Sequence, residues 1–304
     1  MSAELALAVA LAAILDRTVR ELPARVHPVV AFGTLVGYAD REWSRPRLAG
    51  VGFALALPAL AAVPVFAAVA LAVAIHPLLG AVVAGVVLFT TSSLQMLLEE
   101  AAGVIEASTT DPTAARERLP ALAGRDPTAL SPELLRSAAV ESASENLADG
   151  LVAPLLAFSL LAPISLSLGA AAAAWLKAVN TLDSMLGYPS KPHGWASARM
   201  DDLVMWVPAR LSALLLSAAA LSPDPVLTAR RWRGETASPN SGWPMATAAG
   251  ALQVRLEKPD TYVLNELASL PTAEQARRGV ALVGRAGLLA YVLALLPGVV
   301  AWLF

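Results

Sequence analysis

The chain of 304 residues has no cysteine, which excludes disulfide bonds, iron–sulfur ligation and thiol catalysis. Charged residues are also scarce, at 15%, whereas a soluble globular protein carries about 25%. The net charge of −2 gives no bulk field that would favour nucleic acid or an acidic partner. The patterns G-x-x-x-x-G-K-[ST], G-x-G-x-x-G, H-E-x-x-H and G-x-S-x-G are absent. Any nucleotide site would therefore have to be an unusual, helical one.

Hydrophobic residues are abundant instead, at 57%, and the mean hydropathy is +0.61. This composition predicts an all-α, multi-pass integral membrane protein that forms a single domain over residues 1–304. A membrane-spanning helix needs about 20 apolar residues. The tracts that come near this length are 48–73, 78–97, 151–179, 203–221 and 280–304, with a hinge at His76-Pro77 between the first two. The first fifteen residues lack a basic start and a cleavage site, so they indicate a retained membrane helix or interfacial anchor.

Polar segments separate these tracts, at 16–47, 98–150, 180–202 and 222–279. Most of the basic residues lie in the first, second and fourth, which predicts that these segments are polar helical loops on the cytoplasmic face of the cell membrane. Simple counting of spans would place 180–202 on the other side. A break at "LAPIS" (161–165), which would make 151–179 a re-entrant hairpin, removes that conflict, because non-helical backbone is tolerated at that depth where protein covers it.

The segment "SPELLRSAAVESASENLADG" predicts one helix over 131–150, with Ser131 as its N-cap and Gly150 at its exit. Glu141, Glu145 and Asp149 recur every four residues and share a face, where like charges repel. No basic residue beside them would neutralise this face. A divalent cation such as Mg²⁺ or a substrate would explain the pattern, and a solvated helix face would explain it equally well.

A second polar group occurs in "WLKAVNTLDSMLGY", where Lys177, Asn180 and Asp183 recur at intervals of three in an apolar context. Ionisable residues at the end of a membrane tract are costly and usually functional. The alternatives are a structural pair of Lys177 with Asp183 and a lysine that extends to the membrane interface.

A third group lies in "HGWASARMDDLVMW", where Arg199, Asp201 and Asp202 precede an apolar tract. The two acids could cap a helix, or could form a site for metal and phosphate together with Arg199. His193 is interpreted as a loop residue rather than a ligand.

The fourth group is the turn "SPNSGWP", whose Ser, Pro, Asn and Gly residues predict a rigid loop with exposed backbone amides. Such a loop is a natural anion cradle, and Trp243 offers a stacking face beside it. Arg230, Arg231 and Arg233, just upstream, fit the positive-inside pattern. His27, before Pro28, is either structural or a substrate contact.

"VESASENLADGLVAPL", "KAVNTLDSMLGY", "GWASARMDDLVMWVPARL" and "SPNSGWPMATAAGAL" occur in this order, and together they resemble the CobD/CbiB family of adenosylcobinamide-phosphate synthases. "HPVVAFG" and the apolar tail also fit, so the resemblance covers nearly the whole chain. It departs from the family at the start, where "LDRTV" keeps Asp16 but lacks the usual Gly-Asp-Pro turn, and between Gly187 and Gly194, where the chain is short.

The resemblance implies a membrane enzyme of cobalamin biosynthesis. Such an enzyme joins a propionate carboxylate of adenosylcobyric acid to (R)-1-aminopropan-2-ol or its O-phosphate, with ATP and Mg²⁺ as implied cofactors. A carboxylate is a poor electrophile, so ATP would convert it to an acyl phosphate that the amine attacks. Other cobalamin-pathway enzymes are possible partners. The alternatives are a small-molecule transporter, although no internal repeat is present, and a pathway scaffold.

The family motifs fall on specific positions of this sequence. Expected metal ligands are Glu145, Asp149, Asp183 and Asp202. Expected catalytic groups are Lys177, Arg199 and Asp183. Expected substrate contacts are His27, Glu141, Asn146, Asn180, Ser238, Asn240, Gly242 and Trp243.

Overall fold

The computed structural model describes the backbone of residues 2–303 and the side chains of residues 3–296. In this range the all-α prediction is confirmed, because fourteen α-helices are joined by short turns and one small hairpin, β1 (Leu256–Lys258) antiparallel to β2 (Tyr262–Leu264). The chain forms two compact units. Unit 1 comprises residues 2–93, 149–205 and 291–303, and unit 2 comprises residues 94–148 and 206–290.

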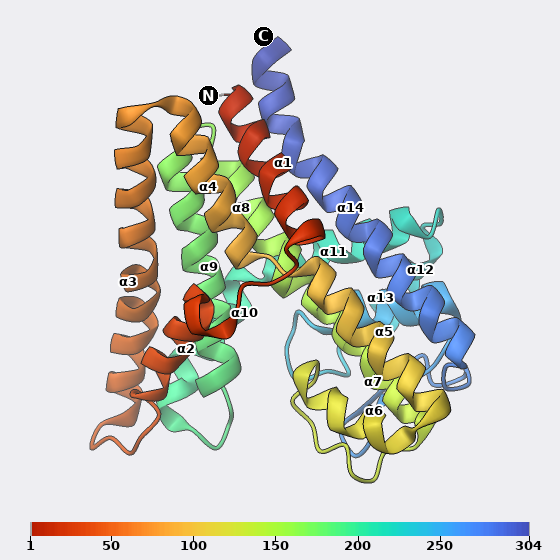
Figure 1. The fold of residues 1–304 in the computed structure, drawn as a ribbon. Helices are drawn as coiled ribbons and strands as arrows, with labels where there is room; N and C mark the ends of the chain where they lie inside the picture. The colour runs from red at the N-terminus through yellow and green to blue at the C-terminus, as the bar shows by residue number, and fades with distance from the viewer. Residues whose placement is uncertain (1, 304) are drawn as a thin grey trace. The chain divides into compact units, whose positions relative to one another are not determined.

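Unit 1 is a group of helices that run along its length, with two further helices at one end (Figure 1). The helices of the group are α1 (Ser2–Thr18), α3 (Pro46–Ile75), α4 (Pro77–Thr91), α8 (Ala153–Leu161) and α9 (Leu166–Leu186). The two at the end, α2 (Pro28–Gly37) and α10 (Trp195–Val204), both pack against α9. Two 3₁₀ turns, Ala24–Val26 and Pro192–Gly194, precede them.

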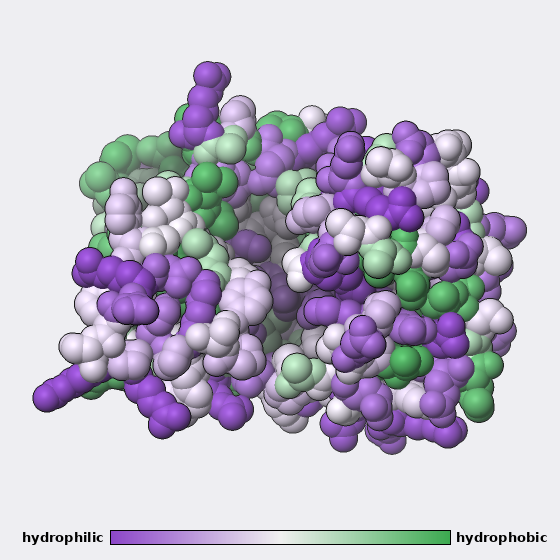
Figure 2. Space-filling model, turned by 90° about the horizontal axis from the view of Figure 1, so that it is seen from below, coloured by the Kyte–Doolittle hydropathy of each residue, from purple (hydrophilic) through white to green (hydrophobic). Residues whose placement is uncertain are grey.

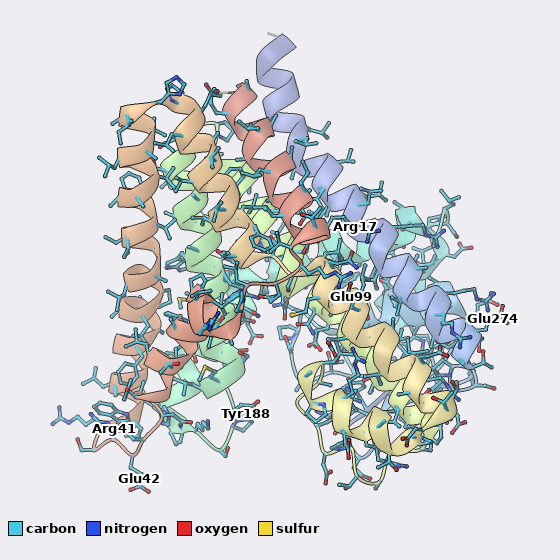
Figure 3. The ribbon with its side chains drawn as sticks, viewed as in Figure 1. Arg17, Arg41, Glu42, Glu99, Tyr188 and Glu274 are labelled. Atoms are coloured by element: carbon cyan, nitrogen blue, oxygen red, sulfur yellow. The ribbon has the colours of Figure 1, made fainter. Side chains whose placement is uncertain are left out.

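Hydrophilic residues predominate at the end of unit 1 that carries α2 and α10, as seen from below in Figure 2. The loops with Arg41, Glu42 and Tyr188 lie at this end (Figure 3). By contrast, α3 exposes a long apolar surface that includes Leu55, Val63 and Leu71. Such a surface matches a helix that faces lipid.

The number of candidate membrane spans is smaller than the predicted five. Among the described residues, three helices are long and apolar enough, namely Pro46–Ile75, Pro77–Thr110 counted through a short break, and Ala273–Leu296. A bent pair, Pro192–Val204 with Trp206–Ala219 at 47°, would make a fourth. The tract 151–179 is no single helix, since α8 and α9 are separated by a turn over 162–165 and pack against each other. The predicted break at "LAPIS" is therefore present.

Several helix ends follow from local chemistry. The Oγ of Ser131 accepts the amide of Leu134 at 3.3 Å, and Thr272 and Gln275 bond each other reciprocally as a capping box. The Nδ1 of His76 accepts the amide of Leu78 at the hinge. The prediction that Gly150 ends its helix is wrong. The chain continues through a π-helical turn, Ala148–Val152, and the Gly150 carbonyl accepts the amide of Ser93 at 3.0 Å.

Unit 2 is a second helical group with its own core. Its helices are α5 (Leu94–Thr110), α6 (Pro112–Arg118), α7 (Pro132–Leu147), α11 (Trp206–Ala219), α12 (Asp224–Trp232), α13 (Gly242–Leu252) and the first part of α14 (Ala273–Leu303), with a 3₁₀ turn at Leu119–Ala121. Buried Val104, Leu135, Val140 and Met245 belong to one apolar cluster. The hairpin packs on α7 and α13.

Candidate functional site

The central polar group of unit 1 lies on α9, where Lys177, Asn180 and Asp183 share one face as their spacing predicts. The neighbouring Val179 and Leu182 are fully buried on the opposite side. Because α9 packs against α3, α4 and α8, the rotation of the helix about its axis is fixed, and so is the direction of its polar face. The expected grouping of these three side chains is therefore present.

The π-helical turn brings Asp149 to the same place. The side chain of Asp149 is half-buried, and burial raises its pKa to about 6, although the Lys177 ammonium and the Asn180 amide oppose that rise. A π-turn inserts one extra residue into a helix and is frequent at functional sites. Here it places Asp149 beside Lys177 and Asn180 of α9.

Two more carboxylates reach the group from α10. Asp201 lies within hydrogen-bonding reach of Asn180, and its Oδ1 is buried without a hydrogen-bond partner in the described structure. Burial and, to a smaller extent, the charge of Asp202 together raise the pKa of Asp183 to about 6. The group therefore contains more acids than bases. The repulsion between its carboxylates is unfavourable unless a cation or a proton binds there.

Two flanking residues complete the group, which we call the acidic cluster: Glu21, His27, Asp149, Lys177, Asn180, Asp183, Asp201 and Asp202. Burial raises the pKa of Glu21, while His27 and Lys177 oppose that rise. His27 pairs with Glu21 through Nε2 and caps α2 through Nδ1, which accepts the amide of Val29. Its placement thus gives it a structural role, and a substrate contact stays a prediction.

A glycine makes room for Asp183. A Cβ on Gly187 would collide with the Asp183 carboxylate, and one on Gly194 would collide with the carbonyl of Leu186. The close packing at the C-terminal end of α9 therefore explains why "LDSMLGY" and "HGWASAR" have glycine at these positions.

An apolar cavity of about 630 Å³ adjoins the acidic cluster. It lies among α2, α3, α4 and α9, and its lining includes Phe32, Leu60, Val87 and Thr181. Lys177 is the one charged residue among its lining residues. Lys177 thus connects a mainly apolar chamber to the acidic cluster, an arrangement typical of small-molecule sites.

Arg199 lies at the edge of this region. Its side chain is 69% exposed, and its Nη1 lies 3.6 Å from Asp202 Oδ2, one helical turn away on α10. His193, interpreted as a loop residue, is buried with its Nε2 3.3 Å from Asp40 Oδ1, a carboxylate that also accepts from Lys191.

The predicted metal ligands fall in different units, since Glu145 belongs to unit 2 and the other three belong to unit 1. In the described part of the chain, no three Asp, Glu or His side chains converge closely enough to hold a metal ion. Mg²⁺, however, commonly takes only one or two carboxylates together with phosphate oxygens. The neighbouring Asp183 and Asp202 fit that mode in donor type and in their mutual repulsion.

Glu141 lies in a separate network in unit 2, where the expectation that no base neutralises it is wrong. The side chain is fully buried, and its Oε2 lies 2.9 Å from Arg125 Nη2. Ser137 and Tyr262 each donate a hydroxyl to this carboxylate at 2.6 Å. Arg125 comes from the irregular segment before α7, which sequence spacing does not reveal. Asn146 donates to the carbonyl of Ser142 on the same helix.

The late turn also lies in unit 2, at the start of α13. Ser238 Oγ accepts the amide of Asn240, and the carbonyl of Asn240 accepts the amide of Trp243. A Cβ on Gly242 would collide with the carbonyl of Arg233. The predicted rigid turn is thus present, and the four expected residues Ser238, Asn240, Gly242 and Trp243 lie together in it.

Sequence reasoning missed three contributors to these groups. Glu21 and Arg125 lie in irregular segments and show no periodicity that would link them to their partners. Arg210 is on α11 and donates to Asn240 Oδ1 at 2.9 Å. The only signal in the sequence was its place at the start of an otherwise apolar tract.

Comparison with known proteins assigns the chain to a family. The profile described as CobD/Cbib protein matches residues 9–287. A "Probable cobalamin biosynthesis protein CobD" from Methanothrix thermoacetophila is 38% identical over 303 residues, which cover 94% of each chain. Proteins called "Cobalamin biosynthesis protein CobD" from Geobacter metallireducens and Klebsiella pneumoniae are 40% and 37% identical, over 78% and 82% of this chain and 76% and 81% of theirs. No solved structure matches. The chain therefore belongs to the CobD/CbiB family.

Proposed function

We propose that this protein acts in cobalamin biosynthesis as an ATP-dependent ligase. It would join adenosylcobyric acid to (R)-1-aminopropan-2-ol or its O-phosphate through an amide bond. The observation that carries the proposal is the acidic cluster of unit 1, in a chain whose relatives are named for cobalamin biosynthesis. Its carboxylates outnumber its one lysine, as in a site that receives a cation and phosphate.

The reaction needs an activated carboxylate. A propionate oxygen of the corrin attacks the γ-phosphorus of ATP and ADP leaves. The amine then attacks the acyl carbon, and inorganic phosphate leaves. Lys177 is placed to hold the negative charge of the carboxylate and the transferred phosphoryl group. Mg²⁺, when bound, offsets charge on the ATP phosphates, and Asp183 and Asp202 are the groups that would hold it.

A proton must also be removed from the amine. An alkylammonium is not a nucleophile, and a carboxylate with a pKa near neutrality is a suitable base. Asp149 and Asp183 both have their pKa raised to about 6. We assign the proton transfer to Asp149, because Asp183 would be occupied by Mg²⁺ in the loaded site. Arg199, largely exposed, is free to move toward a phosphate.

The test is ligation by the purified protein in detergent. Adenosylcobyric acid, ATP, Mg²⁺ and either form of the amine are supplied, and corrin product and ADP are followed by mass spectrometry. We expect product only with both ATP and Mg²⁺. Intact corrinoid binding without product or ATP turnover would reject the ligase and favour transport or scaffolding.

A further inference from the structure

Two arginines of unit 2 converge on one tryptophan next to the late turn. The guanidinium carbon of Arg210 lies 5.3 Å from the centre of the Trp243 ring, and that of Arg233 lies 5.0 Å from it. Arg210 also stacks on Trp206 at 4.2 Å. One indole thus holds two like charges close together. Like charges are unfavourable at short range unless an anion lies near both.

Neither arginine has a carboxylate partner among the side chains of residues 3–296. In that range Arg210 donates from Nη1 to the carbonyl of Trp206 at 2.7 Å and to Asn240 Oδ1 at 2.9 Å. Both acceptors are neutral. Arg233 is exposed, and among the described side chains its contact is the stacking on Trp243.

The geometry of Arg210 is fixed by these contacts. Its two hydrogen bonds use Nη1, so Nη2 and Nε remain as donors on the other edge of the planar group. Asn240, which accepts from it, is 4% exposed and is held in the turn that opens α13. An arginine oriented in this way is preorganised for the paired hydrogen bonds that a phosphate accepts.

The turn brings Arg233 to the same place. Since Gly242 has no Cβ, the chain at the start of α13 packs directly on the carbonyl of Arg233. Ser241, the N-cap of α13, makes no side-chain cap hydrogen bond. The aligned peptide dipoles of this 11-residue helix add positive potential beside the two guanidinium groups, while Pro244 has no amide hydrogen and the amide of Trp243 already donates to the carbonyl of Asn240.

We propose that Arg210 and Arg233, held on Trp243, bind a phosphate ester. The phosphate belongs either to a reactant, meaning ATP or aminopropanol O-phosphate, or to the headgroup of an anionic phospholipid. The reactant source rests on the proposed function, whereas the lipid source does not.

The experiment compares three variants of the full-length protein in detergent: Arg210→Gln, Arg233→Gln and Arg231→Gln. Arg231 is the matched control, since it stacks on Trp232 at 5.0 Å two residues before Arg233 and does not reach Trp243. Affinities for ATP without Mg²⁺ and for aminopropanol O-phosphate are measured by calorimetry, with adenosine and unphosphorylated aminopropanol as phosphate-free probes. Retention of phosphatidylglycerol against phosphatidylcholine is measured by native mass spectrometry.

We expect both Arg210→Gln and Arg233→Gln to lower the affinity for one phosphate-bearing ligand by about 10- to 100-fold. Arg231→Gln should change the same affinity by less than about twofold. Loss confined to ATP or aminopropanol phosphate identifies a reactant, and loss confined to phosphatidylglycerol identifies a lipid. Either result supports the site. Unchanged affinity for all of them in Arg233→Gln, which removes only an exposed side chain and so keeps the fold, would overturn it.

The two proposals fail in different ways. A wild-type protein that ligates while both arginine variants bind every phosphate ligand normally would overturn the arginine site and leave the ligase standing. If the wild-type protein makes no product and both arginine variants retain less phosphatidylglycerol than it does, the ligase is overturned and the arginine site stands.

Discussion

Both units hold carboxylates within the protein, and the partners of these carboxylates differ between the two units. In unit 2 the Glu141 carboxylate meets Arg125, Ser137 and Tyr262, so its charge and its lone pairs are satisfied within the fold. In unit 1 Asp149, Asp183, Asp201 and Asp202 meet mainly one another, Asn180 and Lys177. A buried charge that is fully paired is part of the structure, and removing its partner is costly.

The excess of carboxylates over bases in unit 1 has a different meaning. Crowded carboxylates with raised pKa values cost stability in the free protein, and such costs are retained at sites that act on a ligand. Part of the acidic motif, as the sequence shows it, is therefore structural and part is a candidate site. The division falls within ten residues, between Glu141 and Asp149.

The largest expected effect is on the structural side of this comparison. Glu141→Gln leaves the Arg125 guanidinium buried without a counter-charge, so we expect the free energy of unfolding to fall by about 3 to 5 kcal/mol. Unfolding titration in mixed micelles measures it. Glu133→Gln on the same helix is the control, because its pair with Arg136 has a 48% exposed carboxylate and contributes less than about 1 kcal/mol. Equal effects of the two substitutions would show that the Glu141 network is not special.

The next effect is on catalysis. Lys177→Met removes the cation between the acidic cluster and the cavity, so we expect kcat to fall by about 100-fold at unchanged folding. Lys191→Met is the matched control, since Lys191 pairs with Asp40 at 2.6 Å on the surface. Ligation by Lys177→Met within threefold of wild type would remove Lys177 from the mechanism.

A smaller effect concerns pH. The pKa of Asp183 is raised from 3.8 to about 6, so the folded protein holds this proton more tightly than the unfolded chain. Stability therefore falls as pH rises from about 4 to about 6, and stays lower above that window. We expect Asp183→Asn to be more stable than wild type above pH 6 without Mg²⁺, by on the order of 1 kcal/mol after allowance for partial exposure.

The check is a pair of unfolding titrations, at pH 7.5 and near pH 4, where the two proteins should converge. A wild-type protein that becomes more stable relative to Asp183→Asn between pH 4 and pH 6 would contradict the raised pKa.

The smallest effect is expected at Arg199. Because this side chain is 69% exposed and 3.6 Å from Asp202, Arg199→Gln should change the free energy of unfolding by less than about 1 kcal/mol. If Arg199 reaches a phosphate in the complex, KM for ATP rises about tenfold while stability stays constant. A loss of stability without a change in KM would assign it to structure alone.

Local features of the fold were predictable from the sequence. Ser131 and Thr272 have the cap chemistry of helix starts, and "LAPIS" marks the turn between α8 and α9. The spacing of Lys177, Asn180 and Asp183 was sufficient to place them on one face. These features depend on residues within about one or two helical turns of one another.

Features that depend on distant parts of the chain were not predictable. Arg125 reaches Glu141 from an irregular segment, and Arg210 reaches Asn240 from a different helix. The four-residue period of Glu141 and Asp149 is interrupted by the π-turn at 148–152. Asp149 interacts with Lys177 and Asn180, whereas Glu141 pairs with Arg125. Among the described residues three or four helices, and not five, are candidate spans. Small apolar residues such as alanine enrich helices packed within protein as well as those that face lipid.

The most direct test compares Asp183→Asn with Glu141→Gln in the ligation assay, with equal amounts of folded protein confirmed by size-exclusion chromatography. Asp183, in the acidic cluster, should be essential for ligation, and Glu141, which pairs with Arg125, should not. We therefore expect no detectable product from Asp183→Asn and near wild-type turnover per folded molecule from Glu141→Gln. Full activity of Asp183→Asn, with loss of activity in folded Glu141→Gln, would contradict the assignment of the site to the acidic cluster of unit 1.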